Sequence, residues 1–123
     1  MCKIFLDDMR QPIDCTSYMY NRIGELYSIY LGDWIVVRNY EGFVDAVTKH
    51  IDEITHVSFD HDLSELHYNP NTWVEGYEYD ERTGYDCAIW LKHFYDEKKK
   101  ELPTMFVHSM NPVGTKNIIN VFK

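Results

Sequence analysis

Two stretches of the sequence decide the fold: KIFLDD at residues 3–8 and THVSFDHD at residues 55–62. Each begins as a short, mostly apolar run and ends abruptly in carboxylates, which is typical of a buried strand that reaches a polar edge. WIVVR at residues 34–38 and TMFV at residues 104–107 are also rich in β-branched or apolar side chains. The sequence therefore predicts four buried strands, at residues 3–6, 34–38, 55–59 and 104–107.

The segments between these strands predict helices. Residues 40–53 carry apolar side chains at helical spacing, and TGYD at residues 83–86 resembles a capping box that opens a helix reaching the lysine run 98–100. Asn111-Pro112 is a favourable N-cap and first-turn pair for a last helix to Lys123. Aromatic residues at roughly helical spacing predict one irregular helix within residues 11–33. Strands alternating with helices indicate an α/β fold with a parallel sheet and right-handed crossovers.

Length and composition are those of a globular protein. With 123 residues and 45% hydrophobic content, residues 1–123 are expected to form a single domain with its own core. The formal net charge of −8 disfavours duplex DNA and anionic membranes as partners. Three cysteines without CxxC spacing, no signal-peptide pattern and no apolar run of about 18 residues favour a cytoplasmic protein that does not span a membrane.

Polar side chains follow every predicted strand. Ligands of open parallel sheets bind beyond the carboxyl ends of the strands, so these side chains are expected to meet at one edge. An acidic pair such as Asp7-Asp8 is also common in simple turns. Asp60-His61-Asp62 is harder to explain by structure alone, because three titratable groups after an apolar strand need water, partners or a ligand. The residues expected at this edge are Asp7, Asp8, Arg10, Arg38, Asp60, His61, Asp62, His108, Ser109 and Asn111.

The carboxylates of this edge predict a cation. Carboxylates within reach of one another repel unless protons or a cation neutralise them. Oxygen ligands suit a hard divalent ion, so Asp7, Asp8 and Asp60 are the predicted ligands if Mg²⁺ or Mn²⁺ is a cofactor. The same carboxylates are expected to raise the pKa of neighbouring imidazoles.

The histidines of this edge predict acid–base chemistry. Opening a cyclic phosphodiester needs one group that takes a proton from the attacking water and one that protonates the leaving oxygen. His61 and His108 are the candidates for this pair, with Asp62 in the same catalytic group. Spacing leaves open which of the two histidines is the acid.

Cationic and hydrogen-bonding residues near the same edge predict phosphate contacts. The start of the last helix adds backbone N–H groups and the positive end of the helix dipole. Gly114-Thr115-Lys116 is not a P-loop, because the preceding glycine of that motif is absent. The predicted phosphate-binding residues are Arg10, Arg38, Ser109, Asn111 and Lys116.

Residues 64–82 form an aromatic excursion after the third strand. Its aromatic side chains suit either stacking on a nucleobase, as a lid, or packing of the loop onto the sheet. His67 in this excursion is a further residue that could reach the site. The aromatic residues in question are Tyr68, Trp73, Tyr77 and Tyr79.

Four motifs in order along the chain resemble those of the cyclic-phosphate processing receiver domains, a receiver-like group of bacteria and phages. They are FLDDMRQP (5–12), VSFDHDL (57–63), TGYDCAIWL (83–91) and VHSMNPVGTKN (107–117). The resemblance implies a receiver-like, flavodoxin-like open sheet of about four parallel strands in the order 2-1-3-4, with helices on both faces. The positions that match the motifs are Asp7, Asp8, Arg10, Asp60, His61, Asp62, His108, Ser109 and Asn111.

The resemblance also implies an activity on cyclic phosphates, at an RNA end or on a small nucleotide, in RNA repair or in nucleotide signalling between phage and host. A hydrolytic phosphodiesterase and a protein that only sequesters a cyclic nucleotide signal are both compatible with the same residues. Phosphoacceptor receivers are the third hypothesis, with Asp60 as acceptor. They have a lysine after a fifth strand, whereas the remainder of this chain predicts a helix, so the sheet is expected to be truncated.

Overall fold

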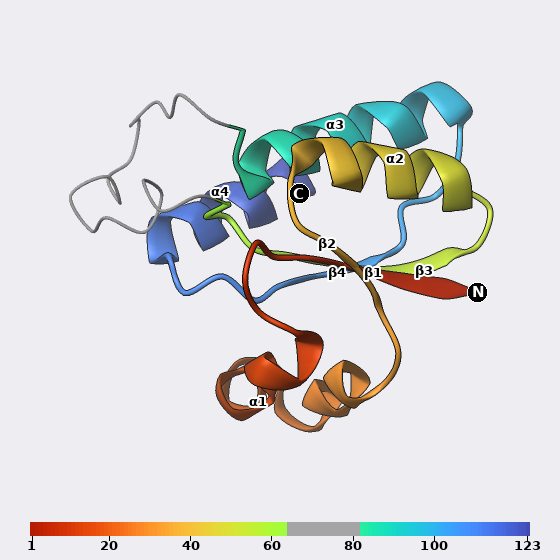
Figure 1. Cartoon of the computed structure of the whole chain (residues 1–123). Helices are drawn as coiled ribbons and strands as arrows, with labels where there is room; N and C mark the ends of the chain where they lie inside the picture. The colour runs from red at the N-terminus through yellow and green to blue at the C-terminus, as the bar shows by residue number, and fades with distance from the viewer. Residues whose placement is uncertain (64–81) are drawn as a thin grey trace.

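A parallel four-stranded sheet forms the centre of the computed structural model, which describes residues 1–63 and 82–123. The order is β2-β1-β3-β4, as expected. Figure 1 shows the strands at the centre of the fold, between the helices. The predicted lid and His67 lie outside the described residues. The strands are β1 (Cys2–Leu6), β2 (Ile35–Val37), β3 (Ile54–Phe59) and β4 (Thr104–Val107).

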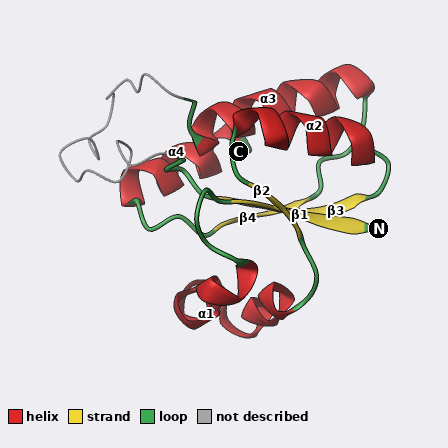
Figure 2. Ribbon diagram, in the orientation of Figure 1, coloured by secondary structure: helices red, strands yellow, loops and turns green. Residues whose placement is uncertain are grey.

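Helices cover both faces of the sheet, which confirms the predicted α/β layers (Figure 2). Strand alternation sends Ile4 and Leu6 into the core under one helical layer, while Phe5 enters the core on the other face. One layer contains α2 (Tyr40–His50), α3 (Gly84–Lys98) and α4 (Pro112–Val121). The other contains the 3₁₀ helix η1 (Pro12–Cys15), α1 (Thr16–Ile23) and the 3₁₀ helix η2 (Gly24–Leu31).

The prediction of one irregular helix within residues 11–33 is wrong. The structure has three helical segments there, and Gly24 separates the last two with φ of 62°. This left-handed backbone conformation is open to glycine and ends α1. Aromatic spacing could not reveal these breaks, because 3₁₀ and α turns place side chains at similar intervals.

Caps set the two helix starts next to the polar edge. The Thr83 N–H donates to Asp86 Oδ2 (2.8 Å) at the start of α3, and Asn111 Oδ1 accepts from the Gly114 N–H (3.0 Å) at the start of α4. Both starts were expected from the sequence. Among the described residues no strand follows β4, since the chain passes into α4. No helix in the described ranges has the length and apolar character needed to cross a membrane.

Candidate active site

The carboxyl ends of β1, β3 and β4 bring polar residues side by side. The strand pairing continues one residue past each strand: the Asp60 N–H donates to the Leu6 carbonyl, and the His108 N–H donates to the Phe59 carbonyl, each at 2.9 Å. Asp7, Asp60 and His108 therefore occupy neighbouring positions although about 100 residues separate the first from the last. The expected meeting of these three residues at one edge is seen in the structure.

Asp7 is held as a fixed hydrogen-bond acceptor. Its Oδ1 accepts the backbone N–H groups of Met9 (2.9 Å) and Arg10 (2.8 Å). Its Oδ2 lies 3.1 Å from His108 Nε2 and accepts from Arg10 Nη1 at 3.4 Å. Burial by itself would raise the pKa of Asp7, but the hydrogen bonds from His108, Arg10 and Met9 outweigh it, and the pKa lies below its ordinary value. All four acceptor positions of this carboxylate are used.

His108 lies entirely inside the protein, with 0% of its surface exposed. The ring stacks on Phe5, with centroids 4.3 Å apart and an interplanar angle of 8°. Its Nδ1 lies 2.7 Å from Ser58 Oγ. Burial lowers the pKa of His108 despite the opposing effect of Asp7. The expectation that carboxylates raise the imidazole pKa is therefore wrong for this residue, because desolvation of the cation outweighs the attraction.

His61, Asp62 and Asn111 form a second group at the edge, and each is less than 5% exposed. His61 Nδ1 lies 2.8 Å from Asp62 Oδ1, which also accepts from Asn111 Nδ2 at 3.2 Å. The carboxylate can only accept, so Nδ1 carries the proton and Nε2 of a neutral ring is the basic nitrogen. The His61 ring also packs against Gly114, where a Cβ would collide with it.

Asp60 is the acidic residue between these two groups. Burial raises its pKa to about 8, the negative charge of Asp7 adds to this, and the charge of Arg10 opposes it. Its Oδ1 accepts the His61 N–H at 2.9 Å. Asp60 therefore holds a proton at neutral pH, or a cation in place of the proton.

Three residues at this edge could hold a cation, and they differ in one member from the predicted ligands. Asp7, Asp60 and His108 each offer a ligand atom, and these atoms lie within 4.8 Å of one another. His108 stands in this group, where the sequence predicted Asp8. Two carboxylates and an imidazole are compatible in type with Mn²⁺. Binding through Asp7 or His108 Nε2 would replace hydrogen bonds that these atoms already make.

The predicted phosphate-binding residues divide into two kinds. Arg38 Nη1 donates to the carbonyls of Asp7 (3.1 Å) and Arg10 (2.8 Å), so it fixes the loop after β1. Ser109 Oγ accepts the Asn111 N–H at 3.1 Å and is buried, as is Asn111 itself. These three residues have structural partners. Arg10 also donates to Asp7 but is partly exposed, and Lys116 is exposed. Phosphate binding by all five stays a prediction.

Tyr30 and Ser58 were not singled out from the sequence. The Tyr30 hydroxyl lies 2.6 Å from Ser58 Oγ, so it extends the contact between Ser58 and His108. Ser58 could have been recognised from the sequence, because it is a polar residue within the apolar run of β3 and so needs a hydrogen-bond partner. Nothing in the sequence indicates that Tyr30, on η2, reaches it.

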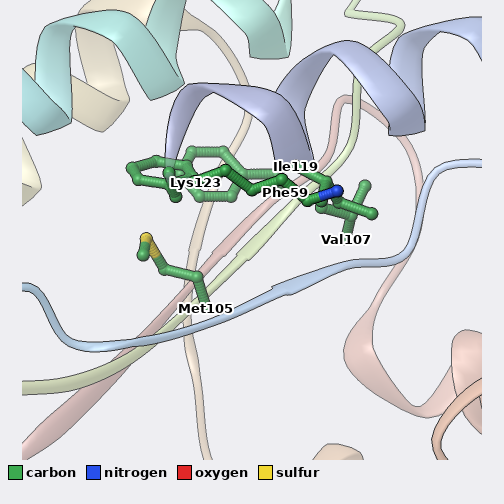
Figure 3. Close-up of a pocket in the computed structure, with 6 residues that line it drawn as sticks. Phe59, Met105, Val107, Ile119 and Lys123 are labelled. Atoms are coloured by element: carbon green, nitrogen blue, oxygen red, sulfur yellow. The ribbon is translucent and has the colours of Figure 1, made fainter.

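A pocket of about 260 Å³ lies apart from these polar groups, between β4 and α4 (Figure 3). Met105 points from β4 toward α4, and the lining is almost entirely apolar. It contains none of the polar strand-end residues. Its lining residues are Phe59, Met105, Val107, Ile119, Phe122 and Lys123.

The sheet order, the helices on both faces and the acidic residues at the ends of β1 and β3 define a receiver-like α/β protein. Within that class, the chain belongs to the family described as Cyclic-phosphate processing Receiver domain, whose model matches residues 2–123. Neither the curated proteins nor the solved structures contain a significant match. The family resemblance of the four sequence motifs is confirmed.

Proposed function

We propose that the protein is a phosphoesterase that opens a cyclic phosphate on a small nucleotide or at an RNA end. The observation that carries the proposal is the pairing of His61, oriented through Nδ1 by Asp62, with Asp60, a carboxylic acid that keeps its proton at neutral pH. A base and an acid in adjoining positions are what this reaction requires.

His61 would take a proton from the attacking water through Nε2. The water oxygen bonds to phosphorus, one ring P–O bond breaks, and the leaving oxygen receives a proton from the acid, which gives a phosphomonoester. Sequence reasoning named His61 and His108 as the acid–base pair and left open which of them is the acid. Both ring nitrogens of His108 face protein groups, so His108 would act by way of Asp7. Asp60 is the donor in this proposal because its raised pKa keeps it protonated.

Charge neutralisation would come from Arg10, which is partly exposed and lies beside two acidic residues, and from the exposed Lys116 in the middle of α4. Arg38, Ser109 and Asn111 would shape this region through the hydrogen bonds described above. If a divalent ion such as Mg²⁺ or Mn²⁺ replaced the Asp60 proton, Asp60 would hold it with Asp7, Asp8 or His108. The ion would then supply charge at the phosphate, and Asp60 would no longer be the proton donor. The three free thiols fit our proposal of a reducing, cytoplasmic setting.

Sequestration of a cyclic nucleotide signal is the second candidate, favoured by the enclosure of the polar groups. Asp60, His61 and Asp62 are each less than 5% exposed, which suits retention of a ligand as well as its turnover. In this alternative His61, held in place by Asp62, would contact the bound ligand without transferring a proton to it.

One experiment separates the two functions. The protein is incubated with a nucleoside 2′,3′-cyclic phosphate, a cyclic dinucleotide and an RNA oligonucleotide with a 2′,3′-cyclic phosphate end, with and without Mn²⁺. Heat then releases bound molecules for mass spectrometry. A product heavier by one water supports hydrolysis, and intact retained ligand supports sequestration. If all three probes are neither altered nor retained, the proposed function is wrong.

A further inference from the structure

A buried chain of four polar side chains runs from η2 to the candidate active site. Tyr30 lies 2.6 Å from Ser58, Ser58 lies 2.7 Å from His108 Nδ1, and His108 Nε2 lies 3.1 Å from Asp7 Oδ2. All four residues are at most 1% exposed. Of these four residues, only Asp7 was a predicted member of a cation or phosphate site. Ser58 and Tyr30 have no role in the chemistry described so far.

The protons of this chain have only one consistent arrangement. The buried Tyr30 hydroxyl has no partner among the described residues other than Ser58, so its O–H donates to Ser58 Oγ. Ser58 must then donate its own proton to His108 Nδ1. A neutral ring that accepts at Nδ1 carries its proton on Nε2, and this N–H donates to Asp7.

The hydrogen bonds at Asp7, at the other end of this row of side chains, require the same assignment of donors and acceptors. Asp7 Oδ1 accepts two backbone N–H groups, and Oδ2 accepts from the guanidinium of Arg10, which has no acceptor of its own. Asp7 is therefore an acceptor for His108 as well. Two independent arguments, one at Tyr30 and one at Asp7, assign the same tautomer.

Packing prevents the His108 ring from turning to another arrangement. Phe5 stacks on one face of the ring at 4.3 Å, and Tyr30 approaches its edge with centroids 6.4 Å apart. The Tyr18 hydroxyl of α1 donates to the His108 carbonyl at 2.7 Å, which fixes the backbone. The tautomer is therefore set by hydrogen bonds in a ring whose position is set by its neighbours.

We propose that Tyr30 and Ser58 are positioning residues of the candidate active site: they hold His108 as the Nε2–H tautomer, so that it aims a fixed donor at Asp7 and immobilises that carboxylate. The inference rests on the proposed function in placing Asp7 at the site. Removing a hydrogen-bond partner that orients a side chain of a site typically changes activity by about 10- to 100-fold.

Nuclear magnetic resonance tests the tautomer without any substrate. Long-range ¹H–¹⁵N correlations of the wild-type His108 ring should place the proton on Nε2 alone. Ser58→Ala removes the donor to Nδ1, so it should shift the Nδ1 signal of the His108 ring and the amide signals of Met9 and Arg10, which report the position of the Asp7 carboxylate. A wild-type proton on Nδ1, or unchanged ring and amide signals in Ser58→Ala, overturns the proposal.

Matched tyrosine variants test the role of the chain in function. Tyr30→Phe removes only the hydroxyl and should lower kcat, or ligand affinity, about 10-fold, with a loss nearer 100-fold in Ser58→Ala. Adding Tyr30→Phe to Ser58→Ala should cause no further loss. Tyr95→Phe is the control, because the buried Tyr95 hydroxyl has no hydrogen-bond partner among the described residues. Equal effects of the two tyrosine variants would contradict the proposal.

The two kinds of measurement separate this proposal from the proposed function. If the wild type neither alters nor retains a cyclic phosphate, the proposed function fails, and the ring and amide signals still decide the role of Tyr30 and Ser58. Should Ser58→Ala not fold, Tyr30→Phe and the wild-type spectrum decide the tautomer.

Discussion

The imidazole of His61 lies against the backbone of Gly114, in the first turn of α4, so closely that a Cβ at position 114 would overlap the ring. This contact joins the end of β3 to the helix that starts after β4. It explains why a residue without a side chain stands in the first turn of α4, where alanine would otherwise favour the helix.

Gly114→Ala should therefore displace His61 and destabilise the protein. Alanine gains about 1 kcal/mol of helix propensity over glycine, but overpacking against a buried ring costs about 1–3 kcal/mol or more. Urea denaturation should show a net loss of unfolding free energy. Asn117→Ala in the same helix is the control for propensity, and a stabilised Gly114→Ala protein would contradict the contact.

Asn111 caps α4 and also holds Asp62, and two substitutions separate these tasks. Asn111→Ser keeps a capping oxygen and loses the N–H to Asp62, at a cost of about 1 kcal/mol. Asn111→Asp also keeps a capping oxygen but places a second carboxylate beside Asp62. At pH 7 the aspartate variant should be less stable than the serine variant.

The difference between these two variants should shrink as the pH falls and the introduced carboxylate gains a proton. Urea denaturation of both proteins at pH 7 and pH 4.5 measures it. A difference that does not depend on pH would mean that the charge at Asp62 is not the cause.

Asp60 makes stability depend on pH in a defined direction. Its pKa in the folded protein, about 8, lies above the ordinary value of 3.8. The stability linked to its protonated form is therefore fully present below the ordinary pKa and is lost as the pH rises through the folded-state pKa. Between pH 5 and 7 this lowers the unfolding free energy by up to about 1.4 kcal/mol per pH unit.

Asp60→Asn should remove this decline, because an amide has no proton to lose. Urea denaturation of wild type and variant at pH 5, 6, 7 and 8 gives the comparison. The lowered pKa of Asp7 has the opposite effect on stability, which is lost as the pH falls below the ordinary pKa of an aspartate. Asp7 therefore does not contribute to the change between pH 5 and pH 8. Parallel curves for the two proteins would refute the assignment of a raised pKa to Asp60.

A divalent ion that binds at this edge should displace the Asp60 proton. Calorimetry with Mn²⁺ at pH 7, in buffers of different ionisation enthalpy, should show release of nearly one proton, and Asp60→Asn should bind at least about 10-fold more weakly. Binding without proton release, or unchanged affinity in the variant, would place the ion elsewhere.

His61 should be essential for turnover if the protein is a phosphoesterase. His61→Ala should lower kcat by about 10²- to 10⁴-fold, which is the usual contribution of a general base. Asp62→Asn should also lower kcat, because it removes the carboxylate that fixes the ring tautomer. His93→Ala, on the exposed side of α3, is the control. Circular dichroism should show that all three variants are folded.

Much of this protein could be predicted from the order of residue types along the chain. Short apolar runs that end in acids gave the strands, and local signals such as Thr83 with Asp86, or Asn111 with Pro112, gave the helix starts. These features depend on neighbours in sequence, so they can be recognised without coordinates. The break at Gly24 was missed because one glycine does not reveal which backbone angles it adopts.

The tertiary structure alone decided how the polar residues are partnered. The sequence predicted His61 and His108 at one edge of the sheet. In the structure His108 is buried by distant segments and donates to Asp7, whereas His61 pairs with Asp62. Tyr30 reaches Ser58 only because η2 folds across the sheet. Protonation states depend on desolvation and on charges within a few ångströms, and neither quantity is defined until the chain has folded.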